Sequence, residues 1–353
     1  MKLDATMQRL WYQGWPIWLL ALLLPLSLFF TVCVRLRRGL YRVGLLRSIR
    51  VGRPVIVVGN ITVGGTGKTP FVIWLAGLLQ QRGLRVGIVL RGYGGTSKHW
   101  PRAVLPQSDH REVGDEAVLL ATRTGTIVVV APDRVAAAKH AIELGAAVIL
   151  ADDGLQHYRL ARDCEIAVVD ERRAFGNGQL LPAGPLREPI SRLRSVNLIV
   201  RTRRAATNTL TLPSVVAPQI AVAAQLGTVV ALAGGEARSI ESFRSAPVHA
   251  VAGIGNPEAF FAALEYAGLQ VKRHPLPDHA VIGGQDIDFA DGLPVLMTQK
   301  DAVKCRELAA EPRYAGASKR CWVVGLDLDV NAADTAAVAT LVEGVLGSSQ
   351  PKQ

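Results

Sequence analysis

The longest apolar run of the chain lies close to its N-terminus. No charged residue occurs between Arg9 and Arg35, and residues 15–34 read WPIWLLALLLPLSLFFTVCV. About 20 apolar residues suffice for a helix to span a bilayer. Aromatic residues gather at the first end of the run and arginines at the other, which is typical of membrane interfaces. The pattern predicts a membrane-associated helix, and Pro25 leaves open whether it spans the bilayer or lies in one leaflet.

Two other interpretations of this run fit less well. A cleaved signal peptide would have a shorter apolar region and a small-residue cleavage site, and the sequence FFTVCV before Arg35 offers neither. A buried soluble helix fits poorly with a proline in mid-run and aromatic residues crowded at one end.

By the positive-inside rule, the arginines after the run place the rest of the chain in the cytoplasm.

From residue 55 onward, short runs of Val, Ile and Leu alternate with helical patterns. Strands that are apolar throughout are typical of a parallel sheet buried on both faces, and their alternation with helices predicts a doubly wound α/β fold. The expected strands are Val55–Val58, Val86–Leu90, Ile127–Val130, Val148–Leu150, Ile166–Val169 and Leu198–Val200. The expected helices are Phe71–Arg82, Glu116–Thr122 and Arg134–Leu144.

A stretch rich in Thr, Ala and Pro interrupts this order at residues 203–218 and predicts a linker or a strand pair between domains. A second α/β series follows, with strands at Val229–Leu232, His249–Ala252, Val295–Thr298 and Trp322–Val324. We therefore divide the chain into a membrane-associated segment (1–38), a core (39–202), a linker (203–228) and a smaller C-terminal α/β domain (229–353).

Composition narrows the function classes. The chain has 353 residues and a formal net charge of +11, and eight basic residues against one acid in the first 50 account for +7 of it. This clustering excludes a generally basic nucleic-acid binder and favours an anionic membrane surface. The four cysteines form no C-x-x-C pair, which excludes a zinc ribbon or a thioredoxin-type site.

A glycine-rich loop follows the first expected strand. Residues 62–69 read TVGGTGKT, and a helix is expected directly afterwards. Strand, glycine-rich loop, Lys-Thr and helix is the P-loop arrangement, in which backbone N–H groups surround phosphate, the lysine reaches the β- and γ-phosphates and the threonine hydroxyl binds Mg²⁺. Thr62 takes the place of the usual first glycine. The expected phosphate-binding residues are Gly64, Gly65, Thr66, Gly67, Lys68 and Thr69.

A pair of carboxylates ends another apolar strand. The sequence AAVILADDGLQH places Asp152 and Asp153 at the carboxyl end of a strand beside the P-loop strand. Such carboxylates can hold Mg²⁺ opposite a P-loop. The sequence therefore predicts a magnesium site formed by Thr69, Asp152 and Asp153, without deciding which aspartate contacts the metal.

These motifs and several others together resemble the tetraacyldisaccharide 4′-kinase family, the lipid A 4′-kinases of Gram-negative bacteria. The resemblance covers nearly the whole chain, and one position departs from it, because Gln299 stands where the family usually shows Glu. The matching stretches are PVIVVGNITVGGTGKTP, LRGYGG, VGDEAVLLA, ILADDGLQH, LLPAGPLREP, GIGNPEAFF, PDH and MTQKDAVKC.

The resemblance implies a P-loop kinase fold and an ATP- and Mg²⁺-dependent activity. The enzyme would transfer the γ-phosphoryl of ATP to the 4′-hydroxyl of tetraacyldisaccharide 1-phosphate, giving lipid IVA in lipid A biosynthesis. Its partners would be this lipid and the membrane surface, with no nucleic acid and no protein partner. The catalytic domains would lie on the cytoplasmic face of the inner membrane.

The resemblance also assigns site residues. Asp115 in VGDEA would orient His279 in the PDH motif or share its proton, with the pair as base, whereas an N-terminal helix cap is the alternative for Asp115. Arg91 in LRGYGG ends an expected strand beside two glycines, where it could neutralise phosphate and complete a catalytic set with Lys68, and an exposed salt bridge is the alternative. Contacts to nucleotide or lipid substrate are expected from Tyr93, Gln156, His157 and Arg187.

A membrane-attached NTPase switch is the alternative from another class, because GGTGKT loops also occur in partitioning ATPases and metallochaperone GTPases. Such a protein would hydrolyse nucleotide without a lipid acceptor. The sequence lacks the additional lysine before the loop and an N/T-K-x-D motif for GTP, because Gln299 separates Thr298 from Lys300. A nucleotide-binding anchor without chemistry is a third alternative, and the intact P-loop and Asp pair argue against it.

Overall fold

The computed structural model describes residues 10–12, 14, 17–203, 217–278 and 280–348. The strands are β1 (Val55–Gly59), β2 (Val86–Leu90), β3 (Arg102–Val104), β4 (Ile127–Val130), β5 (Val148–Asp152), β6 (Cys164–Asp170), β7 (Leu198–Arg203), β8 (Gln219–Ala231), β9 (Ala237–Arg238), β10 (Val248–Ala252), β11 (Val271–Pro275), β12 (Val295–Thr298) and β13 (Cys321–Asp329). The α-helices are α2 (Ile17–Arg42), α3 (Lys68–Gln81), α4 (His110–Val113), α5 (Asp115–Thr124), α6 (Arg134–Glu143), α7 (Pro257–Tyr266), α8 (Gln299–Ala310), α9 (Ala315–Ser318) and α10 (Ala332–Ser348).

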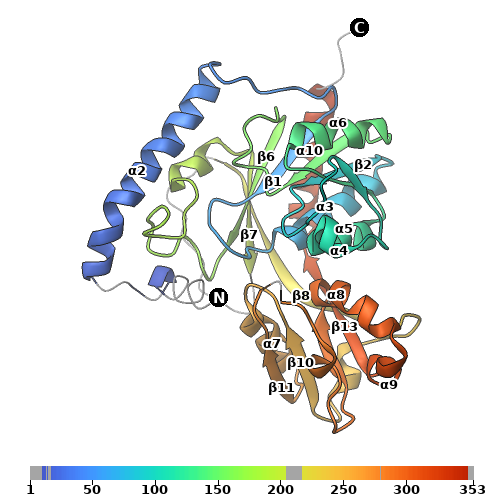
Figure 1. Ribbon diagram of the computed structural model, residues 1–353. Coiled ribbons are helices and arrows are strands. Elements are labelled where there is room, and N and C mark those ends of the chain that lie inside the picture. Colours follow the sequence, from blue (N-terminus) through green and yellow to red (C-terminus); the bar gives the residue numbers. More distant parts are fainter. Residues whose placement is uncertain (1–9, 13, 15–16, 204–216, 279, 349–353) are drawn as a thin grey trace.

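The described strands form one mostly parallel sheet that runs through two lobes (Figure 1). Its order is β11-β10-β12-β13-β8-β7-β6-β1-β5-β2-β4-β3, with β9 beside β8. The antiparallel pairs are β8–β13, β3–β4 and β8–β9. The mostly parallel α/β fold expected from the sequence is confirmed.

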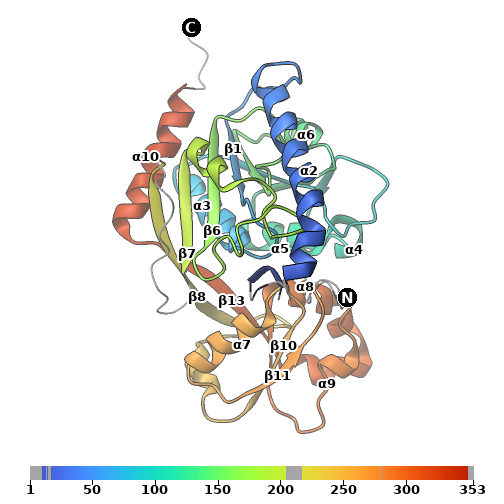
Figure 2. The same cartoon turned by 90° about the vertical axis from the view of Figure 1, so that its left-hand side faces the viewer.

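Strand β1 shows why the apolar pattern produces this fold. Ile56 and Val58 pack into the core on one face of the sheet, and Val55 and Val57 pack into the core on the other face. Because successive side chains of a strand point to opposite faces, a strand that is apolar at every position needs cover on both sides. Residues from α3, α5 and α10 supply one cover, and residues from α6 and the segment 155–199 supply the other (Figure 2).

Strand β8 joins the two lobes and corrects one expectation. Residues 219–228, which the sequence analysis assigned to a linker, belong to this strand. The first half of β8 pairs in parallel with β7, and most of its length pairs antiparallel with β13. The C-terminal lobe nevertheless has two hydrophobic clusters of its own. Residues 204–216 lie outside the described residues, and the division into domains stays a prediction.

Helix α2 lies along the N-terminal lobe (Figure 2). Among the described residues it is the one helix long and apolar enough to cross a membrane, over Leu19–Arg42. One stripe of the helix contacts the protein, where the buried Ser27 hydroxyl donates to the carbonyl of Leu180 at 2.8 Å and Phe30 packs against the core. The opposite stripe is exposed, with Phe29 67% accessible. The helix therefore has a protein-facing side and an apolar solvent-facing side.

Candidate active site

The P-loop forms at the carboxyl edge of the sheet, between β1 and α3. Gly64 and Gly67 adopt positive φ angles of 102° and 84°, which residues with a Cβ atom rarely adopt. Gly67 precedes α3 without giving it a side-chain cap, so the first N–H groups of α3 remain available for an anion. Buried Asn60 supports the loop by donating weakly to the Gly64 carbonyl and the Thr66 hydroxyl, at 3.4 and 3.3 Å.

Asp153 lies opposite the P-loop lysine. Lys68 Nζ is 3.4 Å from Asp153 Oδ1, and Arg187 Nη1 contacts both oxygens of the same carboxylate at 2.9–3.0 Å. Burial by itself raises the pKa of Asp153, but the two cations outweigh it and hold that pKa at about 2. Asp153 also has a φ of 50°, a backbone conformation that costs a non-glycine residue about 1–2 kcal/mol. Asp153 is therefore an ionised carboxylate already paired with two cations.

Asp152 has a different environment. It is buried, and its Oδ1 has no hydrogen-bond partner among the described residues. Burial raises the pKa of Asp152 to about 7, and the charge of Glu116 adds to this effect. A buried carboxylate oxygen without a partner is costly unless a cation or donor satisfies it. The donor set of Asp152 and Thr69 therefore fits a Mg²⁺ ion bound with nucleotide phosphates.

A second charged cluster lies between the lobes, at the start of α5. Asp115 is the first residue of that helix and is 5% exposed, and one of its oxygens accepts from the Glu116 N–H at 2.9 Å. The other oxygen lies 3.8 Å from Lys300 Nζ and 3.9 Å from Lys304 Nζ, on α8 of the C-terminal lobe. Because the cap position of α5 is Gly114, Asp115 is not its N-cap.

Lysine 300 connects this cluster to the PDH segment. Its ammonium is 3.8 Å from Glu116 and 3.3 Å from Asp278, the residue before His279. Burial works against the charge, but the surrounding carboxylates, Asp115 first, raise the pKa of Lys300 above its ordinary value. Glu116, the residue after Asp115, is near enough to Asp152 for its negative charge to raise the pKa of that carboxyl. The α5 cluster at the lobe boundary is therefore within electrostatic range of the expected phosphate site.

Comparison with known proteins identifies the family. A model of the tetraacyldisaccharide-1-P 4′-kinase family matches residues 19–346. The chain belongs to this kinase family. The tetraacyldisaccharide 4′-kinase of Nitrosococcus oceani is 47% identical over 96% of the chain and 95% of its own length. That of Aromatoleum aromaticum is 50% identical over 82% of the chain and 86% of its own length.

A solved structure agrees with the family assignment. The crystal structure described as the "apo" form of LpxK from Aquifex aeolicus in complex with ATP superposes with a TM-score of 0.78. It is 28% identical and covers 93% of the chain and 99% of its own chain. The P-loop kinase-like architecture expected from the sequence is therefore confirmed at the level of the fold.

The structure places the other expected residues of this kinase in two groups. Gln156 donates to the Asn60 carbonyl at 3.0 Å and to Glu188 at 3.2 Å, so its amide joins the P-loop to the LREP segment. Arg91 is exposed, and together with Tyr93 it lines a cavity of about 360 Å³ that follows strand β2. His279 lies outside the described residues, and its role stays a prediction.

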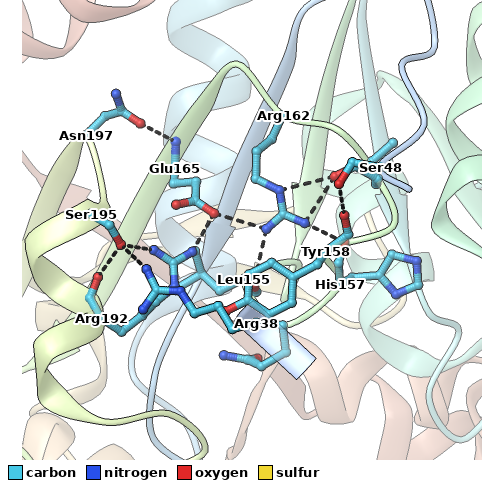
Figure 3. A network of polar contacts seen from close by, with 12 residues as sticks. Arg38, Ser48, Leu155, His157, Tyr158, Arg162, Glu165, Arg192, Ser195 and Asn197 are labelled. Atoms are coloured by element: carbon cyan, nitrogen blue, oxygen red, sulfur yellow. Dashed lines mark hydrogen bonds and ion pairs between the residues drawn. The ribbon is translucent and has the colours of Figure 1, made fainter. Parts of the chain in front are cut away.

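An arginine network holds the loop after Asp153 (Figure 3). Arg162 donates to the carbonyls of Leu155 and His157 and pairs with Glu165 at 3.0 Å. Arg192 also pairs with Glu165, so that this carboxylate bridges the two arginines. Figure 3 shows these groups beside Arg38, whose guanidinium donates to Ser195 at 2.7 Å. The network therefore connects the end of α2 to the loop of the nucleotide site.

Sequence reasoning missed Lys300, Lys304 and Asn60. The two lysines are four residues apart in the MTQKDAVKC motif, a spacing that places both on one face of a helix. That spacing was a usable signal. Nothing local identified Asp115 as their partner, because the contact forms between lobes. Gln299, the departure from the family pattern, is the first residue of α8.

His157 carries a pH prediction. Burial and the positive charge of Arg134 lower the pKa of His157 to about 4, and its buried Nε2 has no hydrogen-bond partner among the described residues. The unfolded chain gains this proton near pH 6.5, so folding stability is lost as pH falls from 6.5 to about 4. We expect His157→Gln to reduce the decline in melting temperature between pH 7 and pH 5. His99→Gln on an exposed loop is the control, and an equal decline in His157→Gln and wild type would contradict the prediction.

Proposed function

We propose that the chain transfers the γ-phosphoryl of ATP to the 4′-hydroxyl of tetraacyldisaccharide 1-phosphate, giving lipid IVA. The observation that carries this proposal is a P-loop lysine ion-paired with Asp153, together with buried Asp115, whose neighbour Glu116 acts electrostatically on Asp152. A nucleotide switch needs the P-loop lysine, but it transfers no phosphoryl group to a hydroxyl and so needs no buried carboxylate as a base. The family membership supports the same reaction and substrate class.

The proposed reaction divides its work between the two clusters. The acceptor hydroxyl oxygen forms a bond to the γ-phosphorus, the bond to the β–γ bridging oxygen breaks, and ADP leaves with the electron pair. Asp115, together with His279, takes the hydroxyl proton. Lys68 and the N–H groups of the P-loop stabilise phosphate charge. When bound, Mg²⁺ would neutralise further charge on the nucleotide, and Asp152 and Thr69 are the residues that would hold it.

Labelled ATP tests this function directly. Purified protein in detergent is incubated with Mg²⁺, γ-labelled ATP and tetraacyldisaccharide 1-phosphate. Label in the lipid would support the kinase, and its loss in chelator would support the metal requirement. ATP hydrolysis with unlabelled lipid would instead favour a nucleotide switch.

The α2 surface supports an inner-membrane location with the lobes on the cytoplasmic face. Because Ser27, Phe30 and Arg38 contact the protein along one stripe, the helix is suited to lie in the outer part of one leaflet with its exposed stripe in lipid. Arginines at its C-terminal end would meet anionic headgroups.

Acidic substitutions on the exposed stripe test this location. We expect Leu26→Asp combined with Phe29→Asp to weaken binding to anionic phospholipid vesicles at least about tenfold, because each buried apolar side chain contributes about 1.5–3 kcal/mol. Sedimentation with vesicles measures the bound fraction. The matched control is Tyr266→Asp with Val281→Asp, two exposed apolar residues of the C-terminal lobe. Equal binding by both double variants would contradict the location.

A further inference from the structure

An arginine that the sequence analysis did not select lies against the P-loop. Arg173 follows β6, and β6 is the parallel neighbour of β1, so the residues after both strands lie at the same edge of the sheet. A Cβ built on Gly64 would be 3.1 Å from Arg173 Nη1. The guanidinium therefore approaches the middle of the glycine-rich loop, which surrounds the phosphates of a bound nucleotide and ends at the lysine that reaches the β- and γ-phosphates.

Hydrogen bonds to Asp170 hold the turn that contains Arg173. Buried Asp170 accepts from the N–H groups of Arg172 and Arg173 at 2.9 and 3.0 Å. The Ala174 N–H donates to the Asp170 carbonyl at 2.8 Å and closes the turn. These bonds determine where the Arg173 backbone lies, so the approach to Gly64 does not depend on the long side chain alone.

Arg173 has no carboxylate partner within 4.0 Å in the part of the chain that the structure describes. The nearest acid in sequence, Glu171, is already paired with Arg201 at 3.4 Å and Arg203 at 3.0 Å. The described contact of the Arg173 guanidinium is the ring of Tyr12, 5.5 Å away. Arg187 differs from Arg173 in this respect, because its guanidinium forms an ion pair with Asp153.

We propose that Arg173 is a further catalytic residue that contacts the transferring phosphoryl group. A guanidinium presents several donors in one plane, which suits phosphate oxygens. An arginine supplied in cis can stabilise the charge that develops on the γ-phosphoryl as its bond to the β–γ bridging oxygen breaks. This inference rests on the proposed kinase function and adds a phosphoryl-stabilising cation to it.

The test compares Arg173→Ala with wild type in the lipid-labelling assay. We expect kcat to fall about 10³-fold, because arginines in this role contribute about 10³–10⁵ in rate. The KM for lipid and the Kd for a fluorescent ATP analogue should change less than threefold. Arg173→Lys should recover less than a tenth of wild-type kcat, because an ammonium lacks the planar donors.

Two controls separate this role from a structural one. Arg172→Ala, on the exposed neighbour in the same turn, should keep kcat within twofold. Tyr12→Leu removes the stacked ring and should keep kcat within tenfold. Equal losses in Tyr12→Leu and Arg173→Ala would overturn the proposal, since Arg173 would then only hold the N-terminal segment.

The remaining outcomes identify other sources of failure. A raised lipid KM with unchanged kcat in Arg173→Ala would also overturn the proposal, because Arg173 would then bind a phosphate of the lipid. Failure of wild type to label lipid would contradict the kinase function itself. Labelling by wild type and by Arg173→Ala at the same rate, with none by Lys68→Ala, would leave the function standing and overturn the role of Arg173.

Discussion

Asp115→Asn is expected to lower kcat for lipid phosphorylation by about 10²–10⁴-fold while ATP binding persists, because positioned bases contribute about that much. The amide keeps the size of the carboxylate but cannot take the acceptor proton. Asparagine also retains an oxygen for the Glu116 N–H, the hydrogen bond that Asp115 accepts at 2.9 Å. The fold at the start of α5 should therefore survive. Lipid labelling measures kcat, and fluorescence of an ATP analogue measures nucleotide affinity.

The control for this substitution is Glu112→Gln. Glu112 lies close in sequence and pairs with Arg102 at 2.5 Å, and its side chain is 43% exposed. We expect the lipid-labelling rate of Glu112→Gln to remain within twofold of wild type, because exposed ion pairs contribute little to stability. If Asp115→Asn labelled lipid as fast as Glu112→Gln, Asp115 would have no part in proton transfer. Loss of ATP binding in Asp115→Asn would point to misfolding of the site instead.

Lys68→Ala is expected to lower lipid labelling at least about 10²–10³-fold, the loss seen when one preorganised donor to a developing negative charge is removed. Lys68 Nζ lies in the P-loop and is paired with Asp153 at 3.4 Å. Because Arg187 also pairs with that carboxylate, Asp153 keeps a partner and no unpaired buried charge results. The variant should fold with a melting temperature close to that of wild type and bind ATP more weakly.

Lys139→Ala is the matched control, since it removes an exposed lysine from α6 on the same lobe. Its labelling rate should equal that of wild type. Full labelling by Lys68→Ala would remove the P-loop from the mechanism. A large fall in the melting temperature of Lys68→Ala would assign its loss of activity to the structure of the loop.

The sequence predicted the core strands closely. For β2, β4 and β12, the expected and observed bounds agree at both ends. These strands are buried and apolar at nearly every position, so the composition of a short segment identifies them. Strand β8 was largely missed, because its alternation of buried and partly exposed small residues follows a segment rich in Thr, Ala and Pro. Its pairing with β13 depends on residues about a hundred positions away.

Some residues of the candidate site could likewise be predicted from the sequence, and others could not. Lys68, Thr69 and the glycines were found because strand, loop and helix are consecutive, and consecutive elements fix their own geometry. The Asp152–Asp153 pair was also found, but the sequence left open which aspartate contacts the metal. The difference between them comes from tertiary contacts, since Lys68 and Arg187 neutralise Asp153, while one oxygen of Asp152 has no hydrogen-bond partner within the described part of the chain.

By itself the sequence determined the family, the P-loop and the apolar N-terminal helix, because each of them is identified by a short run of consecutive residues. The tertiary structure alone decided that Lys300 and Lys304 meet Asp115, and that Arg173 lies against Gly64. These groups are far apart in the chain, and Arg173 and Gly64 follow different strands of the sheet. Their contacts exist only after the sheet has formed and the lobes have met, because a charged side chain carries no local signal of the partner it will face.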